Sequence, residues 1–281
     1  MATATASRSN RWRVLRRSLT FWVGGGIVLI WVIFAIFGDF VTPYDPLGTP
    51  QDVLNRLEPP SSEHWFGTDD LGRDVLSRVL AGARQVLTVA VSATVLGTIT
   101  GTALGLIIGY YGGIIDDVVS RVLDAFLSIP LVITGMLALA ALGPNTLGVI
   151  IVIGLVFMPI IAKTVRAAVL GERQLDYVTA AQLRRENSLY IMFVEILPNV
   201  LSVVIVEFTV RLGYAIFTVL ALSFLGFGVE PSVPDWGLMI NQNRGFLTGG
   251  VWWPVLFPSL AIASLVVGVN LLADSLTEAF E

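Results

Sequence analysis

The sequence predicts an all-α protein that crosses a membrane six times, and three observations support this class. Of its 281 residues, 55% are hydrophobic and only 14% are charged, which differs from the usual balance of a soluble domain. The mean hydropathy is +0.79. The apolar residues also form runs long enough for an α-helix to cross a bilayer, and polar or glycine- and proline-rich segments separate these runs.

The first predicted elements are a polar tail over residues 1–17 and a membrane span over residues 18–40. Arginines beside a span favour the cytoplasmic side, so the tail is expected in the cytoplasm. The apolar run is longer than the core of a signal peptide, and residues 37–40 offer no small-residue cleavage site. We therefore expect a retained helix. The five arginines of the tail are Arg8, Arg11, Arg13, Arg16 and Arg17.

Residues 41–84 are predicted to form an external segment that ends in a helix. The part over 42–70 is rich in proline and acidic residues, whereas 71–84 has apolar residues at helical spacing with Arg73, Asp74 and Arg78 on the opposite face. This helix is expected at the membrane interface or against a neighbouring subunit. Asp69, Arg73 and Asp74 can be interpreted as a binding site, but we favour a capping or inter-subunit role.

The next three spans are predicted over 86–110, 116–142 and 146–170. Small residues recur at every fourth position of the first of these, which lets another helix approach closely, and we expect that helix to belong to the same chain. Pro130 is expected to bend the second span, and Pro159 lies inside the third. The small residues are Ala93, Gly97, Gly101, Gly105 and Gly109.

A polar segment over 171–198 is expected outside the bilayer, because its charged residues are costly in hydrocarbon. It is predicted to contain a helix over 174–183 with Ala180 and Ala181 as small surface residues. A turn over 186–188 and a second short helix over 189–196, ending before Pro198, should follow. Small residues on a projecting helix suit docking into a groove of a partner.

The fifth span, over 200–223, contains Glu207 and Arg211 at a spacing that allows them to pair. Charges at this depth indicate a translocation path, although a structural pair remains equally open. The glycines and prolines of 222–244 exclude a continuous helix there. The sixth span is predicted over 256–272, with a short acidic tail over 274–281.

These motifs resemble those of ABC importer permeases, and in particular the C-type subunit of dipeptide, oligopeptide and nickel importers. Thr179-Ala180-Ala181 matches the Glu-Ala-Ala of the family's coupling loop, and Leu197-Pro198 matches its Leu-Pro. Thr179, Arg185 and Glu195 depart from the family's acid, glycine and isoleucine. The strings over 66–78 and 222–239 resemble two further motifs of this branch.

The resemblance implies the helical fold of a type I ABC importer permease, with a five-helix core over 85–281 and a coupling loop over 171–198. It also implies a role in coupling to an ATPase subunit for Thr179, Ala180, Ala181, Gln182, Arg185, Leu197 and Pro198. Because Arg185 occupies the glycine position, we expect the turn to move to 186–188 with Asn187 at positive φ. Arg185 would then reach an acidic group of that subunit.

The implied function is that of a permease subunit in the bacterial inner membrane, with both termini in the cytoplasm. The implied partners are a second homologous permease subunit, one or two ATP-binding subunits that carry ATP and Mg, and an extracytoplasmic binding protein. Asp69, Arg73, Asp74 and Trp236 are candidates for contact with a subunit or the binding protein. The expected cargo is short peptides, with nickel complexes or haem as the alternative.

Other classes of protein are less consistent with the sequence. It has no Gly-x-x-x-x-Gly-Lys-Ser/Thr loop for a nucleotide and neither a His-Glu-x-x-His nor a Gly-x-Ser-x-Gly string. It has no cysteine and a single histidine, so we expect no enzyme activity, metal site, cofactor or nucleic-acid partner. A secondary transporter would usually carry more intramembrane acids and paired broken helices.

Overall fold

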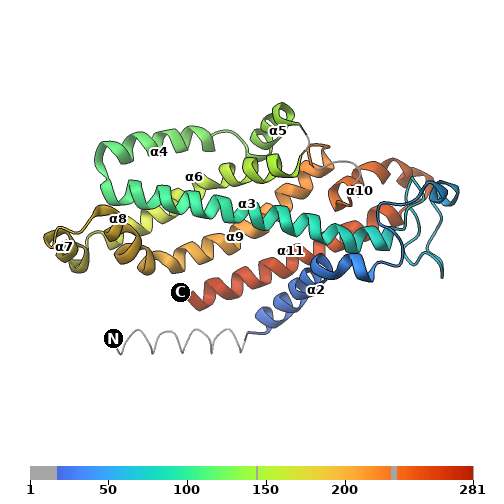
Figure 1. Ribbon diagram of the computed structural model, residues 1–281, viewed down its shortest axis with the longest axis horizontal. Coiled ribbons are helices and arrows are strands. Elements are labelled where there is room, and N and C mark those ends of the chain that lie inside the picture. The colour runs from blue at the N-terminus through green and yellow to red at the C-terminus, as the bar shows by residue number, and fades with distance from the viewer. Residues whose placement is uncertain (1–17, 144, 229–232, 281) are drawn as a thin grey trace.

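The computed structural model describes residues 18–143, 145–228 and 233–280. The predicted tail over 1–17 with its arginines, Pro144 of the turn over 143–145, Pro231 of the external motif and Glu281 lie outside the described residues. Figure 1 shows an elongated bundle of helices that run along its length. Helix α7 lies at one end, and α10 lies at the other end beside the loops that precede α3. We call these the α7 end and the α10 end.

The described residues form helices and no strand, apart from an isolated bridge between Thr68 and Asp74. Five helices are long and apolar enough to cross a membrane, and a bent pair raises the number to six. The all-α class is confirmed, and the predicted six spans hold when that pair counts as one. The α-helices are α2 (Leu19–Val41), α3 (Val75–Tyr111), α4 (Gly113–Leu127), α5 (Leu131–Leu142), α6 (Thr146–Glu172), α7 (Asp176–Leu183), α8 (Ser188–Tyr190), α9 (Leu197–Phe224), α10 (Trp236–Asn243) and α11 (Trp253–Phe280). The short elements are η1 (Pro50–Asn55), the π-helix η2 (Ile191–Ile196) and η3 (Arg244–Gly249).

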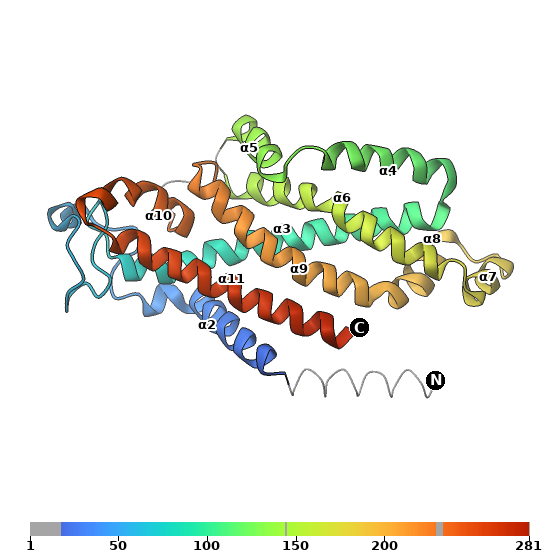
Figure 2. The same cartoon turned by 180° about the vertical axis from the view of Figure 1, so that it is seen from behind.

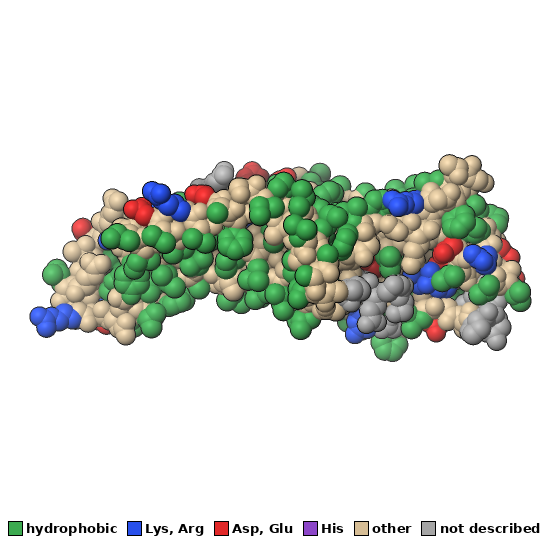
Figure 3. Space-filling view, turned by 90° about the horizontal axis from the view of Figure 1, so that it is seen from above, with side chains coloured by type: hydrophobic (Ala, Val, Ile, Leu, Met, Phe, Trp, Pro, Cys, Tyr) green, Lys and Arg blue, Asp and Glu red, His purple; other side chains and the backbone are tan. Residues whose placement is uncertain are grey.

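Charge is distributed along the bundle as a membrane protein requires. In Figure 3, hydrophobic side chains cover the middle of the visible face, whereas most charged side chains lie toward the two ends. Helix α2 begins where Ser18 caps it, with the Ser18 hydroxyl accepting from the backbone N–H of Phe21. It packs on α3 and α11 and leaves most of its apolar surface exposed.

Helix α3 is a single helix of 37 residues, so the prediction of a separate interfacial helix before the second span is wrong. Asp74 caps its start, and Gly82 lies inside it without breaking it. A side chain at Gly82 would meet the indole of Trp236, so the helix passes close to α10 at this point. At about 1.5 Å per residue, α3 is roughly 55 Å long and exceeds the thickness of a bilayer core.

The small-residue stripe of α3 packs against α6, as expected, within the same chain. A Cβ atom at Gly97 would lie 2.9 Å from the carbonyl oxygen of Gly154, and one at Gly105 would lie 2.7 Å from that of Ala162. These distances leave no room for a side chain, so the two backbones are in direct van der Waals contact.

The predicted bend of the third span is confirmed and is sharp. Helices α4 and α5 meet at 84° around Pro130, which precedes the first residue of α5. Two ion pairs tie α4 to α6, one between Asp116 and Arg166 and the other between Asp124 and Lys163. Figure 2 shows α4 lying along α6 at the edge of the bundle.

Two predicted helix ends are wrong. Pro198 does not end a helix, because α8, η2 and α9 form one continuous helical stretch. In η2 the N–H of Leu197 donates to the carbonyl of Met192, five residues earlier, and this wider turn makes room for the proline ring. Helix α11 runs to Phe280, so the predicted acidic tail is the last part of a helix.

Candidate functional site

Helix α7 presents a polar, small-residue surface at its end of the bundle. Its buried face consists of Val178 and Ala181, so the prediction that both alanines lie on the surface is wrong for Ala181. Ala180 is exposed, together with Thr179 and Gln182. The helix therefore offers a patch with one small residue between two polar ones.

Tyr177 anchors α7 to the end of α6. Its hydroxyl donates to Glu172 Oε2 over 2.7 Å. Partial burial and this carboxylate raise the pKa of Tyr177 to about 12, because both oppose a phenolate. Since Tyr177 stays protonated at neutral pH, its hydrogen bond holds the first turn of α7 against the longer helix.

The turn after α7 is made by Arg185, and the prediction of positive φ at Asn187 is wrong. Arg185 has φ 56°, whereas Asn187 has φ −64° and caps α8 through its side chain. The N–H of Glu186 donates to the carbonyl of Ala181, and that of Arg185 to the carbonyl of Gln182. This is a Schellman motif, which normally places glycine where Arg185 lies.

The Arg185 side chain is exposed, and no ion pair joins it to a carboxylate of the described residues. The left-handed conformation costs a residue with a Cβ about 1–2 kcal/mol. The two backbone hydrogen bonds of the motif offset part of this cost. Arg185 therefore keeps the backbone shape of the family's glycine while adding a cation to the surface.

Glu195, which departs from the family's isoleucine, pairs with Arg184 across the loop. The distance from Arg184 Nη2 to Glu195 Oε1 is 3.2 Å, and Arg184 also lies 3.4 Å from Glu186. Exposed pairs of this kind stabilise little. Leu197 and Pro198 follow in the first turn of α9, where Pro198 is exposed and Leu197 is partly buried.

Glu207 and Arg211 pair inside α9, as their spacing predicted. Arg211 Nε lies 2.9 Å from Glu207 Oε2, and the two side chains are 16% and 14% exposed, respectively. The Arg211 guanidinium also lies over the ring of Tyr214, 5.3 Å from its centre. The pair thus sits at a partly accessible position along a membrane span.

The predicted interface residues at the α10 end are buried inside the chain. Asp69, Asp74 and Trp236 are 1%, 3% and 0% exposed, and Arg73 is 6% exposed. Residues with so little exposed surface do not form a contact surface for another protein. The charged side chains of Arg73, Asp74 and Arg78 therefore face inward, and they fix the segment before α3 to α3 and α10. The capping role that we favoured is confirmed for Asp74, which caps α3.

Asp69 is the centre of this buried network. Its carboxylate accepts from the backbone N–H groups of Leu71 and Arg73, and from Arg73 Nε over 2.8 Å. Arg78 Nε lies 3.5 Å away, and Arg78 also donates to the carbonyl of Pro46. The fully buried Arg78 side chain thus connects the segment around Pro46 to the segment around Asp69.

Two further groups of the network cap helices. Asp74 accepts from the backbone and hydroxyl of Ser77 and lies 2.9 Å from His64 Nδ1. Asp235, which was not among the predicted site residues, accepts from the N–H of Leu238 at the start of α10. Burial raises the pKa of the Asp235 carboxyl. Its position directly before Trp236 was the available signal, since aspartate is a preferred N-cap.

Tryptophans close the α10 end over the external segment. The Trp236 indole donates to the carbonyl of Val79 over 2.8 Å, and that of Trp253 to the carbonyl of Thr68 over 3.0 Å. The N–H of Asp70 donates to Asn243 Oδ1. Burial and the neighbouring Asp69 raise the pKa of Asp70.

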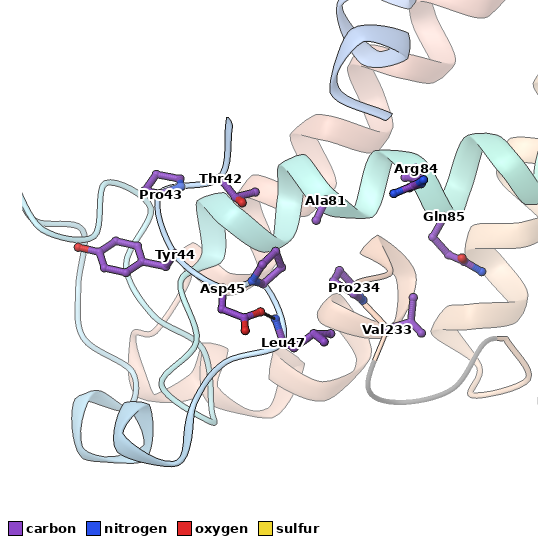
Figure 4. Close-up of a pocket in the computed structure, with 11 residues that line it drawn as sticks. Thr42, Pro43, Tyr44, Asp45, Leu47, Ala81, Arg84, Gln85, Val233 and Pro234 are labelled. Carbon is purple, nitrogen blue, oxygen red and sulfur yellow. Dashed lines mark hydrogen bonds between the residues drawn. The ribbon is translucent and has the colours of Figure 1, made fainter. Parts of the chain in front are cut away.

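A cavity of about 630 Å³ lies beside this network. Figure 4 shows that residues 42–47, the start of α3 and residues 233–234 surround it. Arg84 and Gln85 of α3 are among its polar lining residues, and Asp45 accepts from the N–H of Leu47 at its edge. No motif in the sequence indicated this cavity. Among the described residues, no group of His, Cys, Asp or Glu could hold a metal ion.

Comparison with known proteins gives two family matches. Residues 101–281 match the model of the binding-protein-dependent transport system inner membrane component. Residues 9–60 match the model of the N-terminal TM domain of oligopeptide transport permease C.

Curated relatives match nearly the whole chain. The chain is 37% identical over 266 residues to the di/tripeptide transport system permease protein DppC of Pseudomonas aeruginosa (strain UCBPP-PA14), covering 92% of this chain and 87% of that protein. It is 37% identical to the dipeptide transport system permease protein DppC of Alkalihalophilus pseudofirmus, over 99% of this chain and 91% of that protein. It is 40% identical to the glutathione transport system permease protein GsiD of Salmonella typhimurium, over 96% and 88% respectively.

Proposed function

Because the chain belongs to the family of binding-protein-dependent transport system inner membrane components, we propose that it forms part of the translocation path of an ATP-driven importer of short peptides. The peptide cargo is supported by the names of its relatives, which are permeases for dipeptides, tripeptides and glutathione. Each of these relatives is matched over most of its length, so the likeness extends to the whole transport subunit.

The exposed patch of α7 carries the proposal that this chain couples transport to ATP hydrolysis. Thr179, Ala180 and Gln182 lie on the surface of a helix that projects from the ends of α6 and α9 (Figure 1). A small residue at the centre of a patch lets a partner approach the helix backbone closely. The ATP and Mg would then be bound by the partner, since this sequence has no phosphate-binding loop.

The α7 end is assigned to the cytoplasm and the α10 end to the outside. By sequence, eleven Lys and Arg residues precede α2 or belong to the segments toward the α7 end, against five in the segments at the α10 end, and this asymmetry favours the cytoplasmic side for the α7 end. In this arrangement both termini are cytoplasmic, the ATP-binding subunits dock on α7, and a binding protein delivers cargo at the α10 end of a bacterial inner membrane. A second permease subunit completes the path. The eleven are Arg8, Arg11, Arg13, Arg16 and Arg17 of the tail, with Arg121, Lys163, Arg166, Arg173, Arg184 and Arg185, and the five are Arg56, Arg73, Arg78, Arg84 and Arg244.

A charge placed at the centre of the patch tests the docking role. Ala180→Glu adds a large acid where a partner would approach, and the backbone fold does not depend on this exposed side chain. We expect the complex to reach the membrane at the parental level and to lose at least about tenfold in peptide transport and in transport-linked ATPase activity, equivalent to about 1.4 kcal/mol. Both rates are measured in proteoliposomes with the binding protein.

Gln174→Glu is the matched control, because it adds the same charge at an exposed position outside α7. It should leave transport within about twofold of the parent. Normal coupled transport by Ala180→Glu would overturn the assignment of α7 as the docking helix.

A further inference from the structure

A groove runs along the membrane-spanning part of the bundle between α9 and α11. It encloses about 360 Å³ and is separate from the cavity at the α10 end. The two helices lie side by side in Figure 2, while α2 covers another face of α11. We call it the α9–α11 groove. The residues that matter below are Gly213, Tyr214 and Phe217 of α9, and Asn270, Ala273 and Asp274 of α11.

Asn270 and Asp274 are exposed in this groove and have no partner. Among the described residues, no side-chain hydrogen bond or ion pair reaches either of them. Asn270 lies about 25 Å along α11 from Trp253, at about 1.5 Å per residue, which places it within the span rather than at its outer end. A carboxamide facing hydrocarbon without a hydrogen-bond partner is costly.

The α9 wall of the groove, opposite Asn270 and Asp274, also contains a polar side chain, that of Tyr214. Tyr214 lines the groove and also lies under the guanidinium of Arg211, which pairs with Glu207. Neither member of the pair lines the groove, but Arg211 adjoins it through the ring of Tyr214. The groove thus contains an amide and a carboxylate, and an ion pair lies next to it, behind Tyr214.

Asn270 lies close to Gly213 of α9. A Cβ atom at Gly213 would lie 2.8 Å from Asn270 Oδ1, too close for a side chain. The carboxamide thus rests against the backbone of α9 at the position where Gly213 has no side chain. The exposed rings of Tyr214 and Phe217 provide flat apolar surfaces beside it.

We propose that the α9–α11 groove is a water-lined wall of the peptide path and that Asn270 contacts the main chain of the cargo. This inference rests on the proposed function. A carboxamide both donates and accepts hydrogen bonds, so it pairs with a main-chain amide whatever side chains the peptide carries. Asp274, nearer the cytoplasmic end of α11, offers its carboxylate to the ammonium of the peptide's amino terminus.

Water access to the groove is tested by cysteine labelling, because the chain has no cysteine of its own. Asn270→Cys in the assembled complex should react with a charged, membrane-impermeant thiol reagent in inside-out vesicles. Leu29→Cys on α2 is the control, since Leu29 is 58% exposed in the chain but faces lipid in this assignment. A reactivity at least tenfold above the control is expected. Equal, low reactivity would overturn the inference, because lipid or a partner subunit would then cover the groove.

Transport by side-chain variants tests the contact with cargo. Asn270→Leu keeps the size and removes both hydrogen-bonding groups, so the maximal transport rate should fall about tenfold while the peptide affinity of the binding protein stays unchanged. Asn270→Gln retains a carboxamide and should recover at least half of the parental rate. A parental rate in Asn270→Leu would overturn the contact. A parent complex that moves no peptide would instead overturn the proposed cargo, and the labelling result would still decide whether the groove is water-lined.

Discussion

The two ends of the bundle treat their charged residues in opposite ways. At the α10 end, Asp69, Arg73, Asp74 and Arg78 are buried, and their contacts join the segments around them. Asp69 accepts from Arg73 Nε, whereas Arg73 Nη2 and the Nε and Nη2 atoms of Arg78 have no hydrogen-bond partner among the described residues. At the α7 end, Arg184 and Arg185 are exposed, and α7 rests on the bundle through two buried side chains. The difference teaches that motif residues of one family can have unlike roles: those at the α10 end build a rigid base, and those at the α7 end remain available to a partner.

The buried network at the α10 end depends most strongly on Arg78, and its replacement should have the largest effect on stability. Arg78→Met keeps the length of the side chain but leaves Asp69 with one buried cation fewer and frees the carbonyl of Pro46. Breaking a buried ion pair costs about 3–5 kcal/mol, so folding should be severely impaired. The measurement is thermal unfolding of the detergent-purified protein, followed by circular dichroism.

The matched control for this change is Arg185→Met, which removes an exposed arginine at the other end. Its unfolding temperature should stay close to that of the parent. Similar losses in the two variants would mean that the two ends do not differ as described.

The pair in α9 is intermediate between the two ends, because its side chains are partly exposed. Glu207→Gln leaves the Arg211 charge without its partner, whereas the double change Glu207→Gln with Arg211→Gln removes both charges. We expect a single change to cost about 1–3 kcal/mol and the double change to cost less than the sum. Yield of the assembled complex and its unfolding temperature report this. Strictly additive losses would show that each charge acts independently.

Replacement of the exposed Arg185 should have a smaller effect on stability than replacement of the buried Arg78. Arg185→Gly removes the cost of the left-handed backbone and should stabilise the loop by about 1 kcal/mol. Arg185→Asn also tolerates this backbone and, like glycine, lacks the cation. If the guanidinium reaches an acidic group of the ATP-binding subunit, both variants should lower transport-linked ATPase activity two- to fivefold while the fold is retained. Parental activity in both would exclude that contact.

The smallest effect concerns pH at the α10 end. Burial raises the folded pKa of Asp235 above its ordinary value of 3.8, so the folded state binds the proton more tightly than the unfolded state. This contribution is fully present below pH 3.8 and is lost as the pH rises through the folded pKa. Asp235→Asn keeps a helix cap and cannot titrate. It should reduce the loss of stability that occurs as the pH rises above 3.8, and an unchanged profile would show that Asp235 does not contribute.

The sequence predicted best what local chemistry decides. Apolar run lengths identified α2 and α6, Pro130 marked the bend between α4 and α5, and the fourfold recurrence of glycines in α3 indicated its contact with α6. The spacing of Glu207 and Arg211 predicted their pair. Each of these features depends on neighbours along one helix or on a single residue type, so no knowledge of the whole fold was needed.

The failed predictions concern features that tertiary packing decides. Periodicity showed that Arg73, Asp74 and Arg78 share a face, but burial of that face depends on α10 and α11, which come more than a hundred residues later. Positive φ at Arg185 depends on a hydrogen bond that returns to the carbonyl of Ala181, and that bond outweighs the preference of Asn187. The assignments of the coupling residues, of the translocation path and of the five-helix core over 85–281 remain predictions.

The contacts at the α10 end join residues that are far apart in the sequence, so they can form only late in the synthesis of the chain. The carbonyl of Thr68 accepts from the Trp253 indole, which is synthesised 185 residues later. The N–H of Asp70 donates to Asn243, which is synthesised 173 residues later. At about 5–20 residues per second, the external segment is made roughly 10–40 s before these partners. The α10 end therefore closes only after α10 and the start of α11 have been made, and a chain truncated before α10 presents an unsealed segment to quality-control proteases.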